Sequence, residues 1–188
     1  AAKGTLTIMD VGCGKSYLSF VLNYYLTEVK RMKCHFIGID ISEGVIAASR
    51  AIQQQLGYRN MEFHAMDVKD FQSDRKIDVV LSLHACDTAT DEAIFKGITS
   101  GAGLVVVAPC CHKQIRKQME VHRQKNDLDF LTRHGIFLER QAEMVTDSIR
   151  ALALEAFGYR VKIMEFISDA HTPKNVMIIA EKSRQTAK

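Results

Sequence analysis

Apolar residues in this chain gather in short β-branched runs that alternate with longer segments in which they recur every three or four positions. The short runs predict strands and the longer segments predict helices. The strands are expected at Leu6–Val11, Cys34–Ile39, Met61–Ala65, Ile77–Leu83 and Leu104–Ala108. The helices are expected at Lys15–Val29, Glu43–Leu56, with Ser42 as N-cap and Gly57 just past its end, and Thr88–Thr99. This alternation predicts a parallel sheet with crossover helices.

The C-terminal part follows a different pattern. Two further strands, Tyr159–Ile167 and Asn175–Lys182, are separated by too few residues for a parallel crossover, so they predict an antiparallel hairpin. About 50 residues precede this hairpin, which is far more than a usual connection. We expect a polar helix near His112–His134 and a crossover helix at Asp147–Phe157 capped by Thr146. The chain is thus expected to form a single domain over 1–188 with a helical insertion at about 112–145.

The segment after the first strand predicts a nucleotide-type ligand site. Gly12 and Gly14 follow the acidic residue Asp10 and allow a close approach of backbone to ligand at a helix N-terminus. A dinucleotide fingerprint is disfavoured because Tyr17 stands where its third glycine is required. A P-loop is disfavoured because Met9 stands where its first glycine is required. The remaining pattern, acidic-x-Gly-x-Gly, resembles motif I of class I S-adenosylmethionine-dependent methyltransferases, although Ser16 stands where many of them have another glycine.

Two more carboxylates follow strand ends. Asp40 ends the second expected strand, where a carboxylate can accept the ribose hydroxyls of an adenosine. The alternative role, a helix cap, is already filled by Ser42. Asp67 follows the third strand, in register with Asp10 and Asp40, at the position where methyltransferases hold the adenine amino group.

Cysteine and histidine residues stand at the ends of the fourth and fifth strands. His84, Cys86, Cys110 and His112 are zinc-ligand types, but adjacent residues point apart in an extended chain, and we therefore expect no metal. Small buried polar residues at strand ends are a second interpretation. The third, which we favour, is a substrate pocket in which His84 or His112 contacts the nucleophile.

Four motifs together sharpen the resemblance. Gly-Cys-Gly-Lys at 12–15, Ser-Leu-His-Ala-Cys-Asp at 82–87, Pro-Cys-Cys-His at 109–112 and His-Thr-Pro-Lys-Asn at 171–175 resemble one methyltransferase subfamily. It includes the methyltransferase domain of the glutathione S-transferase C-terminal-domain-containing protein, and it is distantly similar to a tRNA ribose 2′-O-methyltransferase family. The resemblance implies an α/β, doubly wound Rossmann-like methyltransferase fold: a mostly parallel seven-stranded sheet with a C-terminal antiparallel hairpin.

The positions of these residues at strand ends, in loops and on the insertion helix, together with the resemblance, give a set of expected site residues. S-adenosyl-L-methionine would contact Asp10, Gly12, Cys13, Gly14, Lys15, Asp40, Ile41, Asp67, Val68 and Leu83. His84 and His112 would be catalytic. The acceptor would contact Pro109, Cys110, Cys111, Arg116, Arg150, Lys174 and Asn175.

Composition and charge narrow the partners only a little. The chain has 188 residues, 47% of them hydrophobic and 25% charged, a net charge of +3 and five cysteines. No apolar run is long enough to span a membrane, and an odd cysteine count is typical of a reducing cytoplasm. The first expected strand begins as early as Leu6, which suggests that a further structural element precedes it in the protein.

The expected insertion helix is the main basic feature. It carries Lys113, Arg116, Lys117, His122, Arg123 and Lys125. Such a helix beside the site can contact phosphates, or it can be an ordinary solvated face. We therefore predict a methyltransferase that acts on an oxygen or nitrogen, with RNA modification favoured over a protein or small-molecule acceptor. A non-catalytic binding module and a dinucleotide oxidoreductase are the other interpretations.

Overall fold

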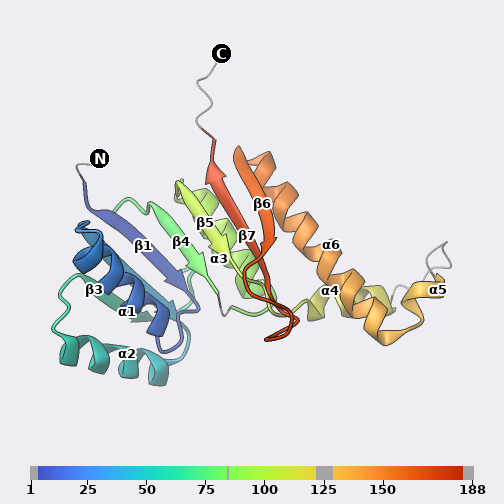
Figure 1. Cartoon of the computed structure of the whole chain (residues 1–188), viewed down its shortest axis with the longest axis horizontal. Coiled ribbons are helices and arrows are strands. Elements are labelled where there is room, and N and C mark those ends of the chain that lie inside the picture. Colours follow the sequence, from blue (N-terminus) through green and yellow to red (C-terminus); the bar gives the residue numbers. More distant parts are fainter. Residues whose placement is uncertain (1–3, 84, 122–128, 184–188) are drawn as a thin grey trace, which may run out of the picture.

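A seven-stranded mixed sheet forms the centre of the protein (Figure 1). The computed structural model describes residues 4–83, 85–121 and 129–183. The strand order is β3-β2-β1-β4-β5-β7-β6. Strands β1 to β5 are mutually parallel, β7 runs antiparallel to β5, and β6 pairs antiparallel with β7. The predicted fold class, including the C-terminal hairpin, is confirmed.

The strands lie where the apolar runs predicted them, within a few residues. Their bounds are β1 Leu6–Val11, β2 Cys34–Asp40, β3 Met61–Ala65, β4 Val79–Ser82, β5 Leu104–Val107, β6 Tyr159–Glu165 and β7 Val176–Lys182. The register pairs Asp10 with Gly38 across β1 and β2, and Ser82 with Val107 across β4 and β5. The carboxyl ends of the five parallel strands therefore share one edge of the sheet, where open α/β folds bind ligands.

Helices cover both faces of the sheet, as Figure 1 shows. Helix α1 (Tyr17–Tyr24), continued by the π-helical turn η1 (Tyr25–Val29), and helix α2 (Glu43–Leu56) lie on one face. Helix α3 (Thr88–Thr99) and helix α6 (Gly135–Ala156) lie on the other. Neighbouring residues of β1 divide between the two cores, because Ile8 packs with Phe20 and Ile46 while Met9 packs with Ile94 and Leu154.

The connection between β5 and β6 differs most from the prediction. Helix α6 begins at Gly135 rather than Asp147, so Thr146 is no cap but lies inside the helix and donates to the carbonyl of Ala142. The first part holds α4 (Lys113–Val121) and the short α5 (Asp129–Thr132), both packed on α6. The predicted helix at His112–His134 spans these two elements and residues 122–128, which lie outside the described residues. Because Thr146 and Asp147 are polar residues inside α6, the pattern of apolar positions did not indicate one continuous helix.

The two ends of α2 compare differently with the prediction, since the end at Gly57 agrees with it and the cap at Ser42 does not. Ser42 occupies the N-cap position of α2 but makes no side-chain capping bond. Instead its own backbone N–H donates to Asp40 Oδ1 over 2.9 Å. Gly57 ends the helix in the left-handed conformation, as predicted, with φ of 70°. Among the described residues, no helix is both long and apolar enough to cross a membrane.

Candidate functional site

The glycine loop after β1 folds back over the end of β2. The backbone N–H groups of Gly12 and Cys13 both donate to the carbonyl of Ile39, and that of Gly14 donates to Asp40 Oδ2 over 3.0 Å. A Cβ atom at Gly12 would lie 3.2 Å from the Cβ of Ala85, in the loop after β4. Gly12 also has a positive φ of 68°, so both conformation and space favour glycine here.

Ser16 adopts a backbone conformation that favours glycine. Its φ of 56° is left-handed, a conformation that costs a non-glycine residue energy. The side chain is buried and its hydroxyl contacts that of Ser49 over 3.2 Å. Ser49 in turn donates to the carbonyl of Gly14. This buried polar contact ties the loop to α2 and accounts for serine at a glycine position.

A pocket of about 250 Å³ opens beside the glycine loop. Its lining combines three carboxylates with small or apolar side chains, contributed by the ends of β1, β2 and β3 and by the start of α3. The lining residues are Val11, Gly12, Ile39, Asp40, Ile41, Met66, Asp67, Val68, Ala85, Ala89 and Glu92. A pocket with apolar walls and a few carboxylate acceptors suits a flat heterocycle joined to a hydroxylated sugar.

Asp40 and Asp67 hold their carboxylates by short backbone contacts. Asp40 accepts from Gly14 through Oδ2 and from Ser42 through Oδ1. Asp67 Oδ1 accepts from the backbone N–H of Lys69 over 2.9 Å. A carboxylate has about four lone-pair sites, so both residues keep acceptor capacity for ligand hydroxyl or amino groups. A second pocket of about 440 Å³ shares Val68 and Glu92 with the first, but no residue of the glycine loop lines it.

Asp10 is buried behind the pocket rather than in its wall. Its Oδ2 atom accepts from the Ser19 hydroxyl over 2.5 Å. Burial raises the pKa of Asp10 to about 6, the hydrogen bond from Ser19 opposes this rise, and the negative charge of Asp40 adds to it. Asp10 therefore supports the start of α1 and stays within range of Asp40, where a cationic ligand group would favour its ionised form.

Other predicted cofactor residues contribute little through their side chains. Cys13 is 5% exposed and packs with Phe20 and Phe63 in the core. Lys15 is exposed, and Leu83 is half-buried just beyond β4. Within the described residues, none of these three lines the pocket. Because the side chain of Cys13 faces the sheet, its predicted contact with the cofactor stays a prediction that falls to its backbone.

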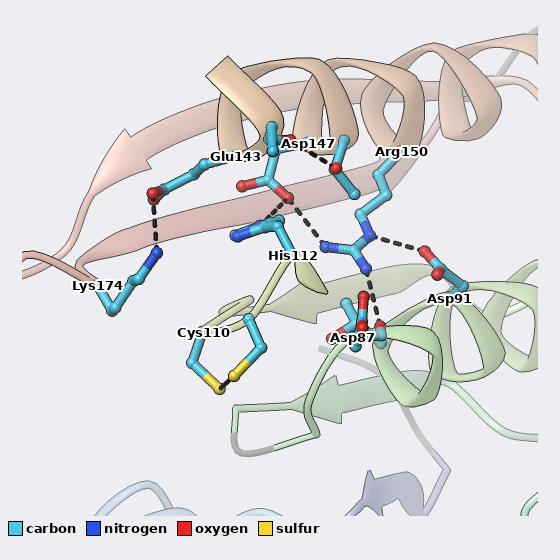
Figure 2. A network of polar contacts seen from close by, with 12 residues as sticks. Asp87, Asp91, Cys110, His112, Glu143, Asp147, Arg150 and Lys174 are labelled. Carbon is cyan, nitrogen blue, oxygen red and sulfur yellow. Dashed lines mark hydrogen bonds and ion pairs between the residues drawn. The ribbon is translucent and has the colours of Figure 1, made fainter. Parts of the chain in front are cut away.

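His112 and Arg150 belong to a buried network, shown in Figure 2. The ring of His112 is fully buried and its Nε2 lies 3.1 Å from Asp147 Oδ1. Arg150 donates to the same oxygen, to Asp91 Oδ1 over 2.7 Å and to the backbone carbonyl of Asp87 over 2.8 Å.

These contacts bear on two predicted roles, catalysis by His112 and acceptor binding by Arg150, and both stay predictions. In this structure Nε2 of the buried His112 ring contacts a carboxylate while its Nδ1 has no partner among the described residues, and the guanidinium of Arg150 has three protein partners. The network joins α6 to the loops after β4 and β5. His84, the other predicted catalytic histidine, lies outside the described residues.

The remaining predicted acceptor contacts are mostly engaged with the protein itself. Arg116 pairs with Glu120 and Glu139, Lys174 pairs with Glu139 and Glu143, and the buried Asn175 donates to the carbonyl of Ile167. Pro109 is buried. The basic residues Arg116 and Lys174 therefore do not form an open cationic face.

Three thiols meet at the edge of the sheet. Cys86 Sγ lies 3.1 Å from Cys110 Sγ and 3.5 Å from Cys111 Sγ, and the last two are 3.7 Å apart. The argument that adjacent Cys110 and Cys111 point apart is wrong, because β5 ends at Val107 and both cysteines lie in an irregular loop. Burial and the two neighbouring thiols raise the pKa of Cys110 to about 12.

Sequence reasoning missed six of the eleven residues that line the pocket, namely Val11, Ile39, Met66, Ala85, Ala89 and Glu92. Val11 and Ile39 end predicted strands, and the apolar pattern of those strands indicated only that the two residues are buried in the core. Ala85 lies in the loop after β4, and Ala89 and Glu92 lie on the first turns of a helix predicted correctly at Thr88–Thr99. The available signal was topological, since a helix that follows the strand next to β1 begins beside the glycine loop.

Comparison with known proteins identifies the family to which this chain belongs. A family model described as a methyltransferase domain matches residues 1–118, well over half of the chain. The chain is 25% identical over 193 residues to the glutathione S-transferase C-terminal domain-containing protein of Bos taurus, with 92% of this chain covered. It spans only 29% of that relative's length.

Solved structures share the fold at low identity. An rRNA methylase from Streptococcus thermophilus superposes with a TM-score of 0.63 at 11% identity, covering 96% of this chain and 89% of the other. Magnesium protoporphyrin IX methyltransferase from Synechocystis PCC 6803, solved with bound SAM, gives 0.52 at 18% identity, covering 95% and 71%. By its family match and its fold, the chain belongs to the methyltransferase domain family.

Proposed function

We propose that this chain transfers the methyl group of S-adenosyl-L-methionine to an oxygen or nitrogen of an acceptor molecule, with RNA the favoured acceptor. The observation that carries the cofactor is the pocket at the carboxyl edge of the sheet, where Asp40 and Asp67 flank apolar walls and Gly12 admits no side chain. The solved relative with bound SAM supports this ligand.

The residues present fit such a cofactor. Asp40 would accept from the ribose hydroxyls, and Asp67 would accept from the adenine amino group, with Ile41 and Val68 against the ring. The buried carboxylate of Asp10 would favour a positive charge near the glycine loop, which is the charge of a sulfonium and of an amino group.

The cofactor, once bound, supplies an electrophilic methyl group for direct displacement by the acceptor. The protein's part is to hold donor and acceptor in line, which can contribute several kcal/mol to lowering the barrier. Within the described residues, His112 is buried against Asp147, so we assign it to the scaffold and not to proton transfer. Proton removal then falls to solvent, to the acceptor's own groups or to His84.

The case for RNA rests on the start of α4. The backbone N–H of Gln114 donates to Asp87 Oδ2 over 3.0 Å, which places the start of α4 beside the loop that precedes α3. Lys113 and Lys117 are exposed on this helix, whereas Arg116 is paired with glutamates. Two exposed lysines on a helix whose start contacts this loop suit phosphate contacts better than they suit an apolar acceptor.

Cofactor binding is tested first, by calorimetry and thermal melting. S-adenosylmethionine and S-adenosylhomocysteine should bind with one site per chain, and NAD should not bind. A ligand selective for the folded state should stabilise it by about 2.7 kcal/mol at a hundredfold excess over its dissociation constant. A protein that binds neither methionine-derived ligand would be a non-catalytic module.

The acceptor is tested by transfer of radiolabelled methyl groups into total RNA, total protein and small-molecule extract from cells lacking the gene. Label in RNA, removed by ribonuclease, is expected. The Lys113→Gln/Lys117→Gln variant should bind RNA more weakly, and the slope of its salt dependence should flatten by roughly one unit for each lysine–phosphate pair removed. The matched control, Lys30→Gln/Lys33→Gln, changes exposed lysines at the opposite edge of the sheet. Label confined to protein would identify a protein methyltransferase.

We further infer that residues 1–188 act as one domain of the Pro-Cys-Cys-His subfamily and that it works in the cytoplasm. The 25% identity to the bovine relative over 92% of this chain supports the subfamily. The five cysteines, all present as free thiols, support a reducing compartment.

A further inference from the structure

The three thiols of Cys86, Cys110 and Cys111, here called the thiol cluster, lie in loops that follow neighbouring strands. Cys86 lies between β4 and α3, and the other two lie between β5 and α4. Strands β4 and β5 pair in parallel up to Ser82 and Val107, so both loops leave the sheet at the same edge. The sulfur of each cysteine is within 3.7 Å of both others.

The spacing suits one shared ion better than one disulfide. Zinc binds thiolates at about 2.3 Å, so two sulfurs of a tetrahedral site lie about 3.8 Å apart. The three observed separations, 3.1, 3.5 and 3.7 Å, need only small side-chain rotations to reach that value. A disulfide would join two sulfurs at about 2.05 Å and leave the third without a role.

The loops that carry the thiols are braced from behind. Arg150 donates to the backbone carbonyl of Asp87, the residue next to Cys86. Through Asp147, the same guanidinium is linked to His112, the residue next to Cys111 (Figure 2). A buried network that fixes the neighbours on both loops holds the three sulfurs together before any ion arrives, which lowers the entropic cost of binding.

We propose that Cys86, Cys110 and Cys111 bind one zinc ion through three thiolates and leave its fourth position open to solvent. Among the described residues, no fourth histidine, cysteine or acidic side chain joins the cluster, and Cys86 is exposed. Three protein ligands with one open position is the arrangement of a catalytic rather than a structural zinc site.

The binding reaction involves no electron transfer. Three S–H bonds break, three protons pass to solvent, and three zinc–sulfur bonds form, with water in the fourth position. Ala85, the residue before Cys86, lines the candidate cofactor pocket. The open position therefore lies in the loop region that adjoins this pocket, where a zinc ion can hold a water molecule or an acceptor atom.

Cobalt(II) tests the site without any dependence on methyl transfer. Reduced, metal-free protein titrated with cobalt should develop thiolate-to-cobalt absorption that saturates at one ion per chain. One equivalent of zinc should then remove this absorption. Cys86→Ser, Cys110→Ser and Cys111→Ser should each lower the zinc affinity at least tenfold. Cys34→Ala, which removes a buried thiol elsewhere in the core, should leave it unchanged.

A second measurement avoids dependence on the folding of the variants. In the wild-type protein, zinc should slow alkylation of Cys86, Cys110 and Cys111 and leave the rates of Cys13 and Cys34 unchanged, as read by peptide mass spectrometry. Absence of cobalt saturation, or protection of other cysteines, would overturn the site. The site would also be overturned if reduced protein bound no zinc and air oxidation formed a disulfide between Cys86 and Cys110. That result would define the two cysteines as a redox pair. The affinity for S-adenosylmethionine should also be measured on zinc-free protein. Zinc-free protein that binds this cofactor would support the proposed function whether or not the zinc site exists.

Discussion

The Oδ2 atom of Asp40 accepts a 3.0 Å hydrogen bond from the backbone N–H of Gly14, which joins the end of β2 to the glycine loop after β1. The two residues are 26 positions apart in sequence but lie on neighbouring parallel strands or just beyond them. Asp40 also lines the candidate pocket. One carboxylate thus shapes the loop and lines the candidate pocket.

The Asp40→Ala variant should lose affinity for S-adenosylmethionine because both contributions disappear. Hydrogen bonds to a charged group contribute about 1.5–3 kcal/mol, so a loss of roughly 10- to 100-fold is expected by calorimetry. Asp74→Ala, an exposed aspartate outside the pocket lining, serves as the matched control and should bind normally. Equal affinities in the two variants would remove Asp40 from the cofactor site.

Asp10 should make the ligand-free protein less stable as the pH rises from about 4 to 6. Its folded pKa of about 6 exceeds the ordinary value of 3.8, so the folded state binds more protons than the unfolded state in this window. The free energy of unfolding therefore falls with rising pH, by about 3 kcal/mol at most. Asp10→Asn keeps an acceptor for Ser19 and should remove this slope, and it should be the more stable protein at pH 8.

Urea denaturation from pH 4 to 8, compared between wild type and Asp10→Asn, isolates this slope from other titrating groups. Asp74→Asn provides the exposed control and should follow the wild-type curve. Parallel curves for wild type and Asp10→Asn would show that Asp10 titrates near its ordinary pKa.

Ser16 should tolerate glycine better than alanine, the reverse of the usual preference near a helix. Alanine keeps the strain of a φ of 56° and removes the hydroxyl that meets Ser49, whereas glycine removes the same hydroxyl but relieves the strain. Ser16→Ala should therefore unfold with about 1–2 kcal/mol less free energy than wild type, and Ser16→Gly should lie closer to wild type. Chemical denaturation measures both, and a more stable alanine variant would contradict the strain.

The sequence predicted the sheet and the glycine loop well because both depend on local signals. Buried parallel strands such as Leu104–Val107 are continuous apolar runs, and the acidic-x-Gly-x-Gly pattern places its own strand and helix. The roles of individual side chains were harder to predict. A histidine, cysteine or arginine such as His112, Cys110 or Arg150 can contact a ligand or pack in the interior, and its residue type alone does not distinguish the two. Only the packing of α6, whose start was misplaced, decides that Asp147 and Arg150 enclose His112.

Arg150 should be essential for stability and not for binding an acceptor. Arg150 is 3% exposed, and its guanidinium pairs with Asp147, which is 4% exposed, and with Asp91. Arg150→Met should lower the free energy of unfolding by about 3–5 kcal/mol, because it leaves the charge of Asp147 buried without a cation. Arg150→Met/Asp147→Asn should recover part of that loss, because the neutral amide still offers an oxygen to His112.

Arg140 on the same helix supplies the control for Arg150. It is exposed, so Arg140→Met should change the unfolding free energy by less than about 0.5 kcal/mol. Calorimetric melting and urea denaturation measure all three variants, and S-adenosylmethionine affinity per folded molecule should stay near wild type throughout. An Arg150→Met protein that unfolds like wild type but no longer methylates its acceptor would restore the role predicted from the sequence, a substrate contact. A double variant no more stable than the single one would show that the cost comes from poorer packing rather than from an unpaired carboxylate.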